Sequence, residues 1–164
     1  MKYAGIIKND VSAGPGVCVT FFVQGCPIHC PGCHNQETWD FEGGKEFTPD
    51  TILEIIDALN ANGVQRNFCI MGGEPMCKEN LFLTYMVLDT VRQKYPNIKI
   101  GIWTGYEFED IEKEFANSKV KGIVDKADYM VCGPFVLAER DITLPMVGSR
   151  NQYVINLTEY RNKS

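Results

Sequence analysis

The sequence lacks several features that would assign it to particular classes of protein. It has no uninterrupted run of about 18 apolar residues, so we expect no membrane-spanning helix. Charge appears early, at Lys2, Lys8 and Asp10, which is unlike a secretory signal peptide. Basic residues are in the minority, with 16 Lys and Arg against 21 Asp and Glu and a net charge of −5. This balance argues against a nucleic-acid partner.

The composition is that of an ordinary globular fold. The chain has 164 residues, of which 45% are hydrophobic and 23% are charged. A chain of this length suits one domain, and no repeat, low-complexity tract or linker divides it. We therefore expect a single domain over residues 1–164.

Strand-like and helix-like segments alternate along the chain. The expected strands cover residues 17–24, 67–71, 98–103, 129–132 and 152–157, and the expected helices cover residues 48–63, 79–95 and 107–117. Alternation of this kind predicts an α/β fold of about four to five βα units, with parallel strands and right-handed crossovers. A closed eight-unit barrel needs about 250 residues, so we expect either an open doubly wound sheet or part of a barrel.

Both architectures place functional residues at the C-terminal ends of parallel strands. The unusual residues of this sequence fall at those positions. A cysteine cluster follows the first expected strand, and Gly72-Gly73-Glu74-Pro75 follows the second. Thr104-Gly105-Tyr106 follows the third, and Gly133-Pro134-Phe135 follows the fourth. The sequence therefore predicts one site at this edge of the sheet.

Cysteine is the residue type that stands out. The seven cysteines are Cys18, Cys26, Cys30, Cys33, Cys69, Cys77 and Cys132. An odd number without an export signal favours reduced thiols and a cytoplasmic location. Cys26, Cys30 and Cys33 form a C-x3-C-x2-C pattern, and thiolates suit zinc or an iron–sulfur cluster.

The two metals make different demands on this pattern. A closed zinc site needs a fourth ligand, for which His29, His34, Cys69 and Cys77 are the candidates. A [4Fe–4S] cluster held by three cysteines leaves one iron open to bind something else. The spacing alone leaves both alternatives open.

Two further segments are candidate ligand-binding turns. Gly72 and Gly73 allow the main chain to approach a ligand closely, Glu74 could accept from an ammonium group, and Pro75 would fix the turn. At the next strand end, a hydroxyl from Thr104 could meet a ribose or a carboxylate, and Tyr106 could form a pocket wall. The alternative for both segments is an ordinary turn between a strand and a helix.

Taken together, these motifs resemble those of a known superfamily. The C-x3-C-x2-C pattern is similar to the signature of the radical S-adenosylmethionine enzymes, and Gly72-Gly73-Glu74 is similar to their GGE motif. The segments 30–39, 103–106 and 148–152 narrow the resemblance to the anaerobic ribonucleotide reductase activating proteins, over about residues 3 to 157. The chain departs from that family at Cys18, Cys132 and Tyr153, where Arg, Asp and Arg are usual.

The resemblance implies a fold and a reaction. The fold would be a partial, open TIM-like barrel of the radical S-adenosylmethionine type. Cys26, Cys30 and Cys33 would hold a [4Fe–4S] cluster whose open iron binds S-adenosylmethionine. Reductive cleavage would give a 5′-deoxyadenosyl radical, which takes a hydrogen atom from a glycine of the reductase. The electron would come from a low-potential donor such as a flavodoxin-like protein.

In this scheme the cluster and the cofactor carry the radical chemistry, and no side chain is assigned as catalytic. The expected cofactor-binding residues are Gly72, Gly73, Glu74, Pro75, Thr104 and Tyr106. One alternative is activation of a different glycyl radical enzyme, of the pyruvate formate-lyase type. Others are a zinc-stabilised module and a ferredoxin-like carrier, although a ferredoxin needs four cysteines per cluster.

Overall fold

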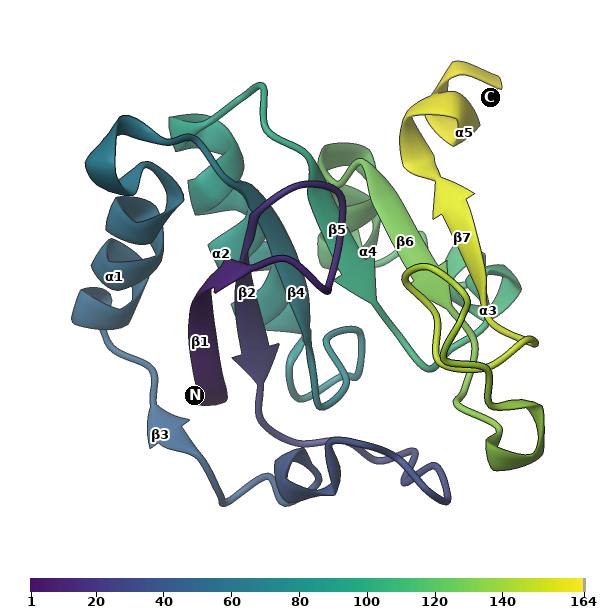
Figure 1. Ribbon diagram of the computed structural model, residues 1–164. Coiled ribbons are helices and arrows are strands. Elements are labelled where there is room, and N and C mark those ends of the chain that lie inside the picture. The colour runs from purple at the N-terminus through teal and green to yellow at the C-terminus, as the bar shows by residue number, and fades with distance from the viewer. Residues whose placement is uncertain (164) are drawn as a thin grey trace.

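Seven strands form one open sheet in the order β3-β1-β2-β4-β5-β6-β7 (Figure 1). The computed structural model describes residues 1–163, so Ser164, the last residue of the expected domain, lies outside the described range. Within that range the architecture is mixed α/β, as the alternating pattern predicts. No described helix is both long and apolar enough to cross a bilayer.

The centre of the sheet is parallel. Its strands are β2 (Cys18–Val23), β4 (Asn67–Gly72), β5 (Ile100–Trp103) and β6 (Tyr129–Cys132). The connecting helices are α1 (Pro49–Leu59), α2 (Leu81–Lys94), α3 (Phe108–Glu112) and α4 (Ser118–Lys126), with short 3-10 turns η1 (Gln36–Thr38) and η2 (Ala61–Gly63). The expected parallel core is confirmed, with three helical crossovers joining its four strands.

The edges of the sheet are antiparallel, which the sequence did not predict. Strand β1 (Lys2–Asp10) pairs with β2, β3 (Lys45–Glu46) pairs with β1, and β7 (Tyr153–Asn156) pairs with β6. Between β6 and β7 lie residues 133–152, here called the strap, whose only helical element is the 3-10 turn η3 (Leu137–Glu139). With no crossover helix the chain turns back beside β6, and a short helix, α5 (Leu157–Lys163), follows.

The third expected helix, residues 107–117, is also shorter than predicted. Only α3 is helical there, and α4 follows as a separate helix. Asn117 explains the break, because its side-chain oxygen accepts from the backbone N of Lys119 at 2.9 Å and so caps α4. Glu109 and Lys113 still form the expected exposed ion pair, at 3.6 Å.

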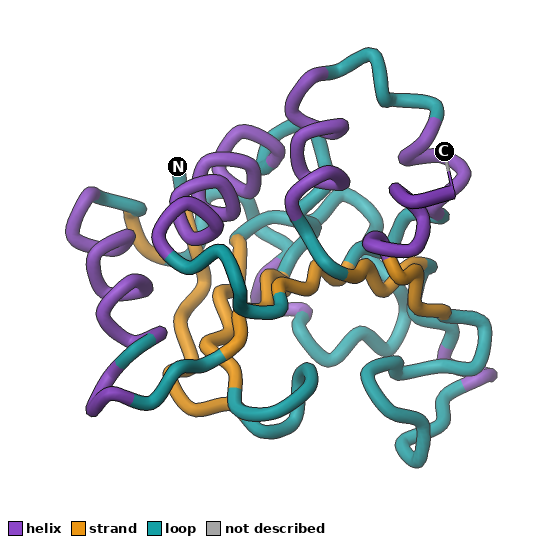
Figure 2. The backbone as a smooth tube through the Cα atoms, turned by 90° about the horizontal axis from the view of Figure 1, so that it is seen from above, coloured by secondary structure: helices purple, strands orange, loops and turns teal. Residues whose placement is uncertain are grey.

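The two faces of the sheet are covered differently. The longer helices lie on one side of the strands, and loops lie on the other (Figure 2). The helical side holds the main core, in which alternate strand residues such as Phe21, Ile70 and Ile102 are fully buried. The loop side carries a smaller cluster of Ala13, Cys18 and Cys69, with Met71 and Trp103 packed against it. It is therefore the loop side that can leave space for a ligand.

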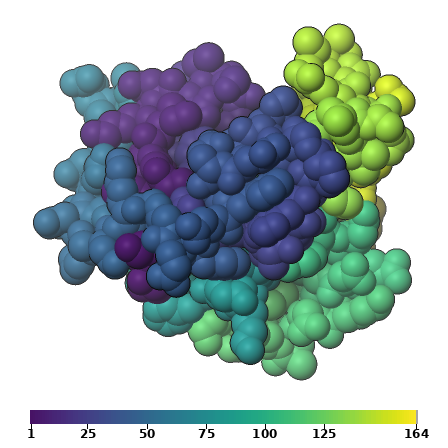
Figure 3. Space-filling view, turned by 90° about the horizontal axis from the view of Figure 1, so that it is seen from below, coloured from purple at the N-terminus to yellow at the C-terminus, as the bar shows by residue number. Residues whose placement is uncertain are grey.

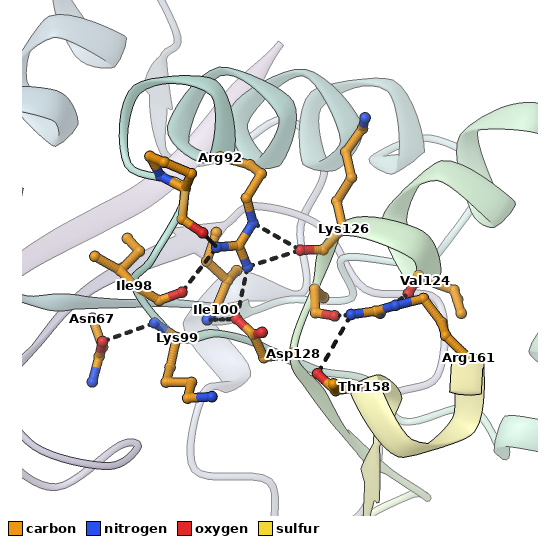
Figure 4. Close-up of polar contacts among 12 residues, drawn as sticks. Asn67, Arg92, Ile98, Lys99, Ile100, Val124, Lys126, Asp128, Thr158 and Arg161 are labelled. Atoms are coloured by element: carbon orange, nitrogen blue, oxygen red, sulfur yellow. Dashed lines mark hydrogen bonds and ion pairs between the residues drawn. The ribbon is translucent and has the colours of Figure 1, made fainter. Parts of the chain in front are cut away.

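A polar network lies at the N-terminal ends of the parallel strands (Figure 4). The Arg92 guanidinium donates to the carbonyls of Lys126 and Ile98 at 2.9–3.0 Å and pairs with Asp128 at 2.6 Å. The Asp128 carboxylate also accepts from the Ile100 backbone N at 2.8 Å. This network fixes the ends of α2 and α4 to the start of β5.

Candidate metal and cofactor site

A pocket of about 150 Å³ lies at the C-terminal ends of the parallel strands. It is lined by all three residues of the cysteine motif, by the Gly72-Gly73-Glu74 segment, by Thr104 and Gly105, and by Gly133, Phe135 and Gln152 of the strap. The remaining lining residues are Ile28, Asn35, Trp39, Met71 and Trp103. Segments far apart in the sequence therefore meet at the edge that the strand pattern predicts.

The cysteine loop, residues 26–33, follows β2 and is held at both ends by main-chain hydrogen bonds. The Cys26 N donates to the Trp39 carbonyl at 3.1 Å, and the Cys33 N donates to the Cys30 carbonyl at 3.0 Å. Gly32 lies at φ +77, a conformation that favours glycine. In the view from below, this blue segment occupies the centre of the face and the yellow-green strap lies beside it (Figure 3).

The donor chemistry of the loop fits an iron–sulfur cluster. All seven cysteines are free, and Cys26, Cys30 and Cys33 are half-buried whereas the other four are buried. A [4Fe–4S] cube takes one thiolate at each of three corners, so the thiols must surround a volume and not a single point. Within residues 1–163, no three His, Cys, Asp or Glu side chains are arranged to hold one metal ion. Burial raises the pKa of the Cys26 thiol, whose proton a metal would displace.

The two glycines of the GGE segment are required by close main-chain contacts. A Cβ at Gly73 would lie 2.3 Å from the Gly25 carbonyl oxygen, and a Cβ at Gly72, whose φ is +108, would lie 2.8 Å from the Val23 backbone N. The backbone N of Gly73 donates to the Val23 carbonyl, and that of Glu74 donates to the Gly25 carbonyl, both at 2.9 Å. These contacts fix the GGE segment against the start of the cysteine loop.

Glu74 is buried, with 1% of its surface exposed, and its carboxylate accepts three hydrogen bonds. Oε2 accepts from the Met76 backbone N at 2.8 Å and from the Thr104 hydroxyl at 2.7 Å, and Oε1 accepts from the Gly105 backbone N at 2.6 Å. Burial raises the pKa of Glu74 to about 7, although these hydrogen bonds oppose the rise. The carboxylate thus joins the turn after β4 to the turn after β5.

The structure does not bring every predicted site residue into the pocket. Gly72, Gly73, Glu74 and Thr104 line it, whereas Pro75 and Tyr106 do not. The Pro75 carbonyl accepts from the Thr84 hydroxyl at 2.7 Å. Tyr106 lines a neighbouring cavity, and burial raises the pKa of its phenol to about 12. A cofactor-binding role stays a prediction for all six residues, including these two.

Aromatic residues of the pocket are what the sequence reasoning missed. From the sequence, Trp39 could either pack around adenine or fill the core, with the core favoured. In the structure it is half-buried, lines the pocket and stacks on His29 with ring centroids 4.4 Å apart. Trp103 lines the same pocket, and its indole N donates to the Met146 carbonyl at 2.8 Å. One signal was present: Trp103 ends a strand directly before the predicted site residue Thr104.

The four cysteines outside the motif are buried. The apolar sequence around Cys69 predicts a buried thiol, and Cys69 is fully buried in β4, close to Cys18 and 3.8 Å from the Tyr129 hydroxyl. Cys132 belongs to the main core. The sequence around Cys77 predicts a more exposed thiol, which is wrong, because Cys77 is 2% exposed. The Tyr153 hydroxyl donates to Glu107 at 2.8 Å and so contacts the start of α3.

Comparison with known proteins places this geometry in a class. Residues 12–155 match the family model described as a 4Fe-4S single cluster domain. That class accords with three half-buried thiols around a pocket at the edge of a parallel sheet.

Three relatives carry one and the same name, anaerobic ribonucleoside-triphosphate reductase-activating protein. The chain is 33% identical to that of Escherichia coli (strain K12), over 96% of this chain and 99% of the relative. It is 32% identical to that of Salmonella typhimurium over the same shares. It is 34% identical to that of Enterobacteria phage T4, over 76% of this chain and 80% of the relative. The chain therefore belongs to the family of anaerobic ribonucleoside-triphosphate reductase-activating proteins.

Proposed function

We propose that this protein is a radical S-adenosylmethionine activase that generates a glycyl radical on an anaerobic ribonucleoside-triphosphate reductase. The observation that carries the proposal is the convergence of the three cysteines, the GGE segment and Thr104 on one pocket. A bound [4Fe–4S] cluster would supply the electron that cleaves S-adenosylmethionine to methionine and a 5′-deoxyadenosyl radical, and this radical would take a hydrogen atom from a glycine of the reductase.

Different residues of the pocket would bind the cluster and the cofactor. Cys26, Cys30 and Cys33 hold the cluster as thiolates. Gly72 and Gly73 let this segment pack directly on the backbone of Val23 and Gly25, and both residues line the pocket in which the cofactor would bind. Glu74 already accepts three internal hydrogen bonds, so its first task is to hold the two turns together. Oε1 accepts only one of them, so its second lone pair could accept from the methionyl ammonium. The Thr104 hydroxyl positions that carboxylate.

The open sheet suits a macromolecular substrate. We propose that residues 1–164 form one radical S-adenosylmethionine domain, a partial TIM-like barrel whose missing strands leave one side of the pocket accessible. A glycine-bearing loop of another protein can fill such an opening, whereas a small metabolite would be poorly enclosed. Glycine also suits the chemistry, because flanking amides delocalise the spin and no side chain blocks approach.

The proposal includes a source of electrons and a compartment. A low-potential carrier such as a flavodoxin-like protein would reduce the cluster. Seven free thiols, three of them half-buried, favour the reducing cytoplasm.

Anaerobic reconstitution tests the proposal. The protein should be brown, hold about four irons per chain, and cleave S-adenosylmethionine to methionine and 5′-deoxyadenosine with a reductant. Adding the reductase from the same source should produce the doublet of a glycyl radical in electron paramagnetic resonance. If only an enzyme of the pyruvate formate-lyase type acquired the signal, the proposed partner would be wrong and the proposed activase activity would stand. A colourless protein with one zinc would refute the activase.

A further inference from the structure

The strap, residues 133–152, lies against the cysteine loop. A Cβ at Gly32 would stand 3.0 Å from Leu137 Cδ1, so Leu137 packs on the main chain of Gly32. The ring centroids of Phe135 and His34 are 5.5 Å apart. Irregular connections of this length are uncommon in compact folds unless they have a function. Because the strap has no long helix or strand to fix it, side-chain contacts must hold it over the turn from Cys30 to His34.

Gln152 joins the two ends of the strap. Its Oε1 accepts from the backbone N of Gly148 at 2.8 Å and from that of Ser149 at 3.1 Å. Its Nε2 donates to the Gly133 carbonyl at 3.0 Å. The Gly133 N in turn donates to the Tyr106 carbonyl at 2.9 Å, which continues the connection to the turn after β5.

Ser149 and Asn151 form a second set of hydrogen bonds that joins the two ends of the strap. The Asn151 Nδ2 donates to the Pro134 carbonyl at 2.7 Å, and its Oδ1 accepts from the Ser149 hydroxyl at 2.6 Å. The same Ser149 hydroxyl accepts from the Val136 backbone N at 3.2 Å. These contacts all lie within the strap, so this polar cluster serves to fold the strap.

We propose that Gln152 is a positioning residue for the cysteine loop. By holding Gly133 to Gly148 and Ser149, it keeps Phe135 and Leu137 pressed against the turn that carries Cys30 and Cys33. The inference rests on the proposed function, which makes these two cysteines cluster ligands. It goes further by assigning their placement to a side chain that is remote in sequence and need not touch the cluster.

Two consequences are measurable. In the protein without a cluster, the strap restrains the turn, so the Cys33 amide, which donates to the Cys30 carbonyl, should exchange its hydrogen slowly. In the reconstituted protein, a strap held in place should limit the access of oxygen to the cluster, and the cluster should bleach slowly in air. A residue that supported only the global fold would not change either rate selectively.

The test compares Gln152→Ala with wild type and with the control Gln93→Ala, whose exposed amide bonds only to Asp89. In Gln152→Ala, loss of three hydrogen bonds should speed exchange at the Cys33 amide about tenfold and leave exchange in β4 unchanged. Cluster bleaching in air should accelerate by a similar factor. The control should match wild type in both measurements.

Two more variants keep the proposal falsifiable if Gln152→Ala fails to fold. Gln152→Glu keeps the oxygen that accepts from Gly148 and Ser149 but places a second carboxylate oxygen against the Gly133 carbonyl, so exchange at the Cys33 amide should be faster than in wild type. Leu137→Ala removes a side chain that is 55% exposed, so it should fold and still speed exchange at Cys33. Wild-type exchange rates in these variants would overturn the proposal. Failure of wild type to hold a cluster would refute the proposed function instead, because the exchange measurement needs no cluster.

Discussion

The seven cysteines divide into two groups by exposure, and the division agrees with the motif. Cys26, Cys30 and Cys33 are half-buried and line the pocket, whereas Cys18, Cys69, Cys77 and Cys132 are buried. A cluster ligand must reach the metal from the protein wall, and a buried thiol in a strand behaves as a small hydrophobic residue. Spacing and exposure therefore select the same three residues.

Alanine substitutions test this assignment. Cys26→Ala, Cys30→Ala and Cys33→Ala should each abolish cluster binding and all cleavage of S-adenosylmethionine, measured as iron content and as 5′-deoxyadenosine formed. Cys69→Ala is the matched control, which should keep its iron and lose about 1–2 kcal/mol of stability from a small cavity. Iron lost from the control, and kept by one of the three, would mean that the ligands are wrongly assigned.

Glu74 is the residue at which structure most refines the sequence-based expectation. Sequence reasoning assigned it to the cofactor ammonium, but its carboxylate holds Met76, Thr104 and Gly105 in place. Glu74→Gln puts an amide NH₂ where an oxygen accepted, which leaves one backbone N–H without an acceptor. The variant also removes the negative charge proposed to face the methionyl ammonium, and a charge-assisted hydrogen bond is worth roughly 1.5–3 kcal/mol, so S-adenosylmethionine should bind about ten- to a hundredfold more weakly.

Isothermal titration of the cluster-loaded protein measures this change. The matched control is Glu54→Gln, which removes an exposed carboxylate that pairs with Lys8 and does not line the pocket. Iron content should be the same in both variants. Unchanged affinity in Glu74→Gln would reduce the GGE segment to a structural turn.

The raised pKa of Glu74 also predicts a pH dependence of stability. Burial raises the carboxyl pKa from 4.5 to about 7, so the folded state binds this proton more tightly than the unfolded state. This proton's contribution to the free energy of unfolding is therefore fully present below about pH 4.5 and is lost as the pH rises through about 7, a total loss of roughly 3 kcal/mol. Denaturant unfolding of wild type without a cluster should show this decline relative to Glu74→Gln. Parallel pH profiles would contradict it.

At the scale of elements, the sequence predicted the parallel core and missed the edges. The β-branched and aromatic run around Phe21 is buried on both faces of the sheet, which makes central strands easy to identify. Strand β1 has exposed residues such as Ile7 and Lys8, so it lacks the continuous burial of a central strand, and it forms an antiparallel pair with the next strand, β2. Partial exposure weakened the signal of this outer strand, and its local pattern alone did not identify it.

The same argument explains what the sequence found of the site. Residues that are unusual where they stand, such as three clustered cysteines and Gly72-Gly73, were identified correctly as a group that meets in one pocket. Trp39 and Gln152 belong to segments that carry the family resemblance, but local pattern does not place them in the pocket, because their position depends on how residues 34–39 and the strap fold back. Their position in the pocket is decided by which distant segments of the chain pack together.

Arg92 holds helices and strands together at the N-terminal ends of the parallel strands, away from the pocket. Its side chain is 19% exposed and that of Asp128 is 17% exposed, and the pair sits among carbonyl groups that need donors. Arg92→Met should lower the free energy of unfolding by about 2–4 kcal/mol, because it leaves a half-buried carboxylate and several carbonyls unpaired. Chemical denaturation measures the loss.

The control for this prediction is Lys121→Met, which breaks the surface pair with Asp125 and should cost less than about 1 kcal/mol. Cofactor affinity should be unchanged in both variants, since the network lies at the edge where the strands begin. Weaker cofactor binding in Arg92→Met would show that the N-terminal ends of the parallel strands are coupled to the pocket at their C-terminal ends.

At the scale of the whole molecule, the pocket depends on nearly the entire chain. Its lining runs from Cys26 in the loop after β2 to Gln152 at the end of the strap, and it includes the turns after β4 and β5. No single segment could form it alone. Binding of S-adenosylmethionine should therefore be coupled to global folding, because a ligand that binds only the folded chain stabilises all of it.

Hydrogen exchange tests this coupling under native conditions. The slowest amides, expected in β2 and β4, exchange by global unfolding, so their protection reports the stability of the whole molecule. With free S-adenosylmethionine at 100 times its dissociation constant, their protection in cluster-loaded protein should rise about a hundredfold. Cys69→Ala should start from lower protection and rise by the same factor, whereas Glu74→Gln should rise less at the same concentration. Protection confined to the pocket loops, with the strands unchanged, would mean that the site folds independently of the sheet and would contradict its assembly from the whole chain.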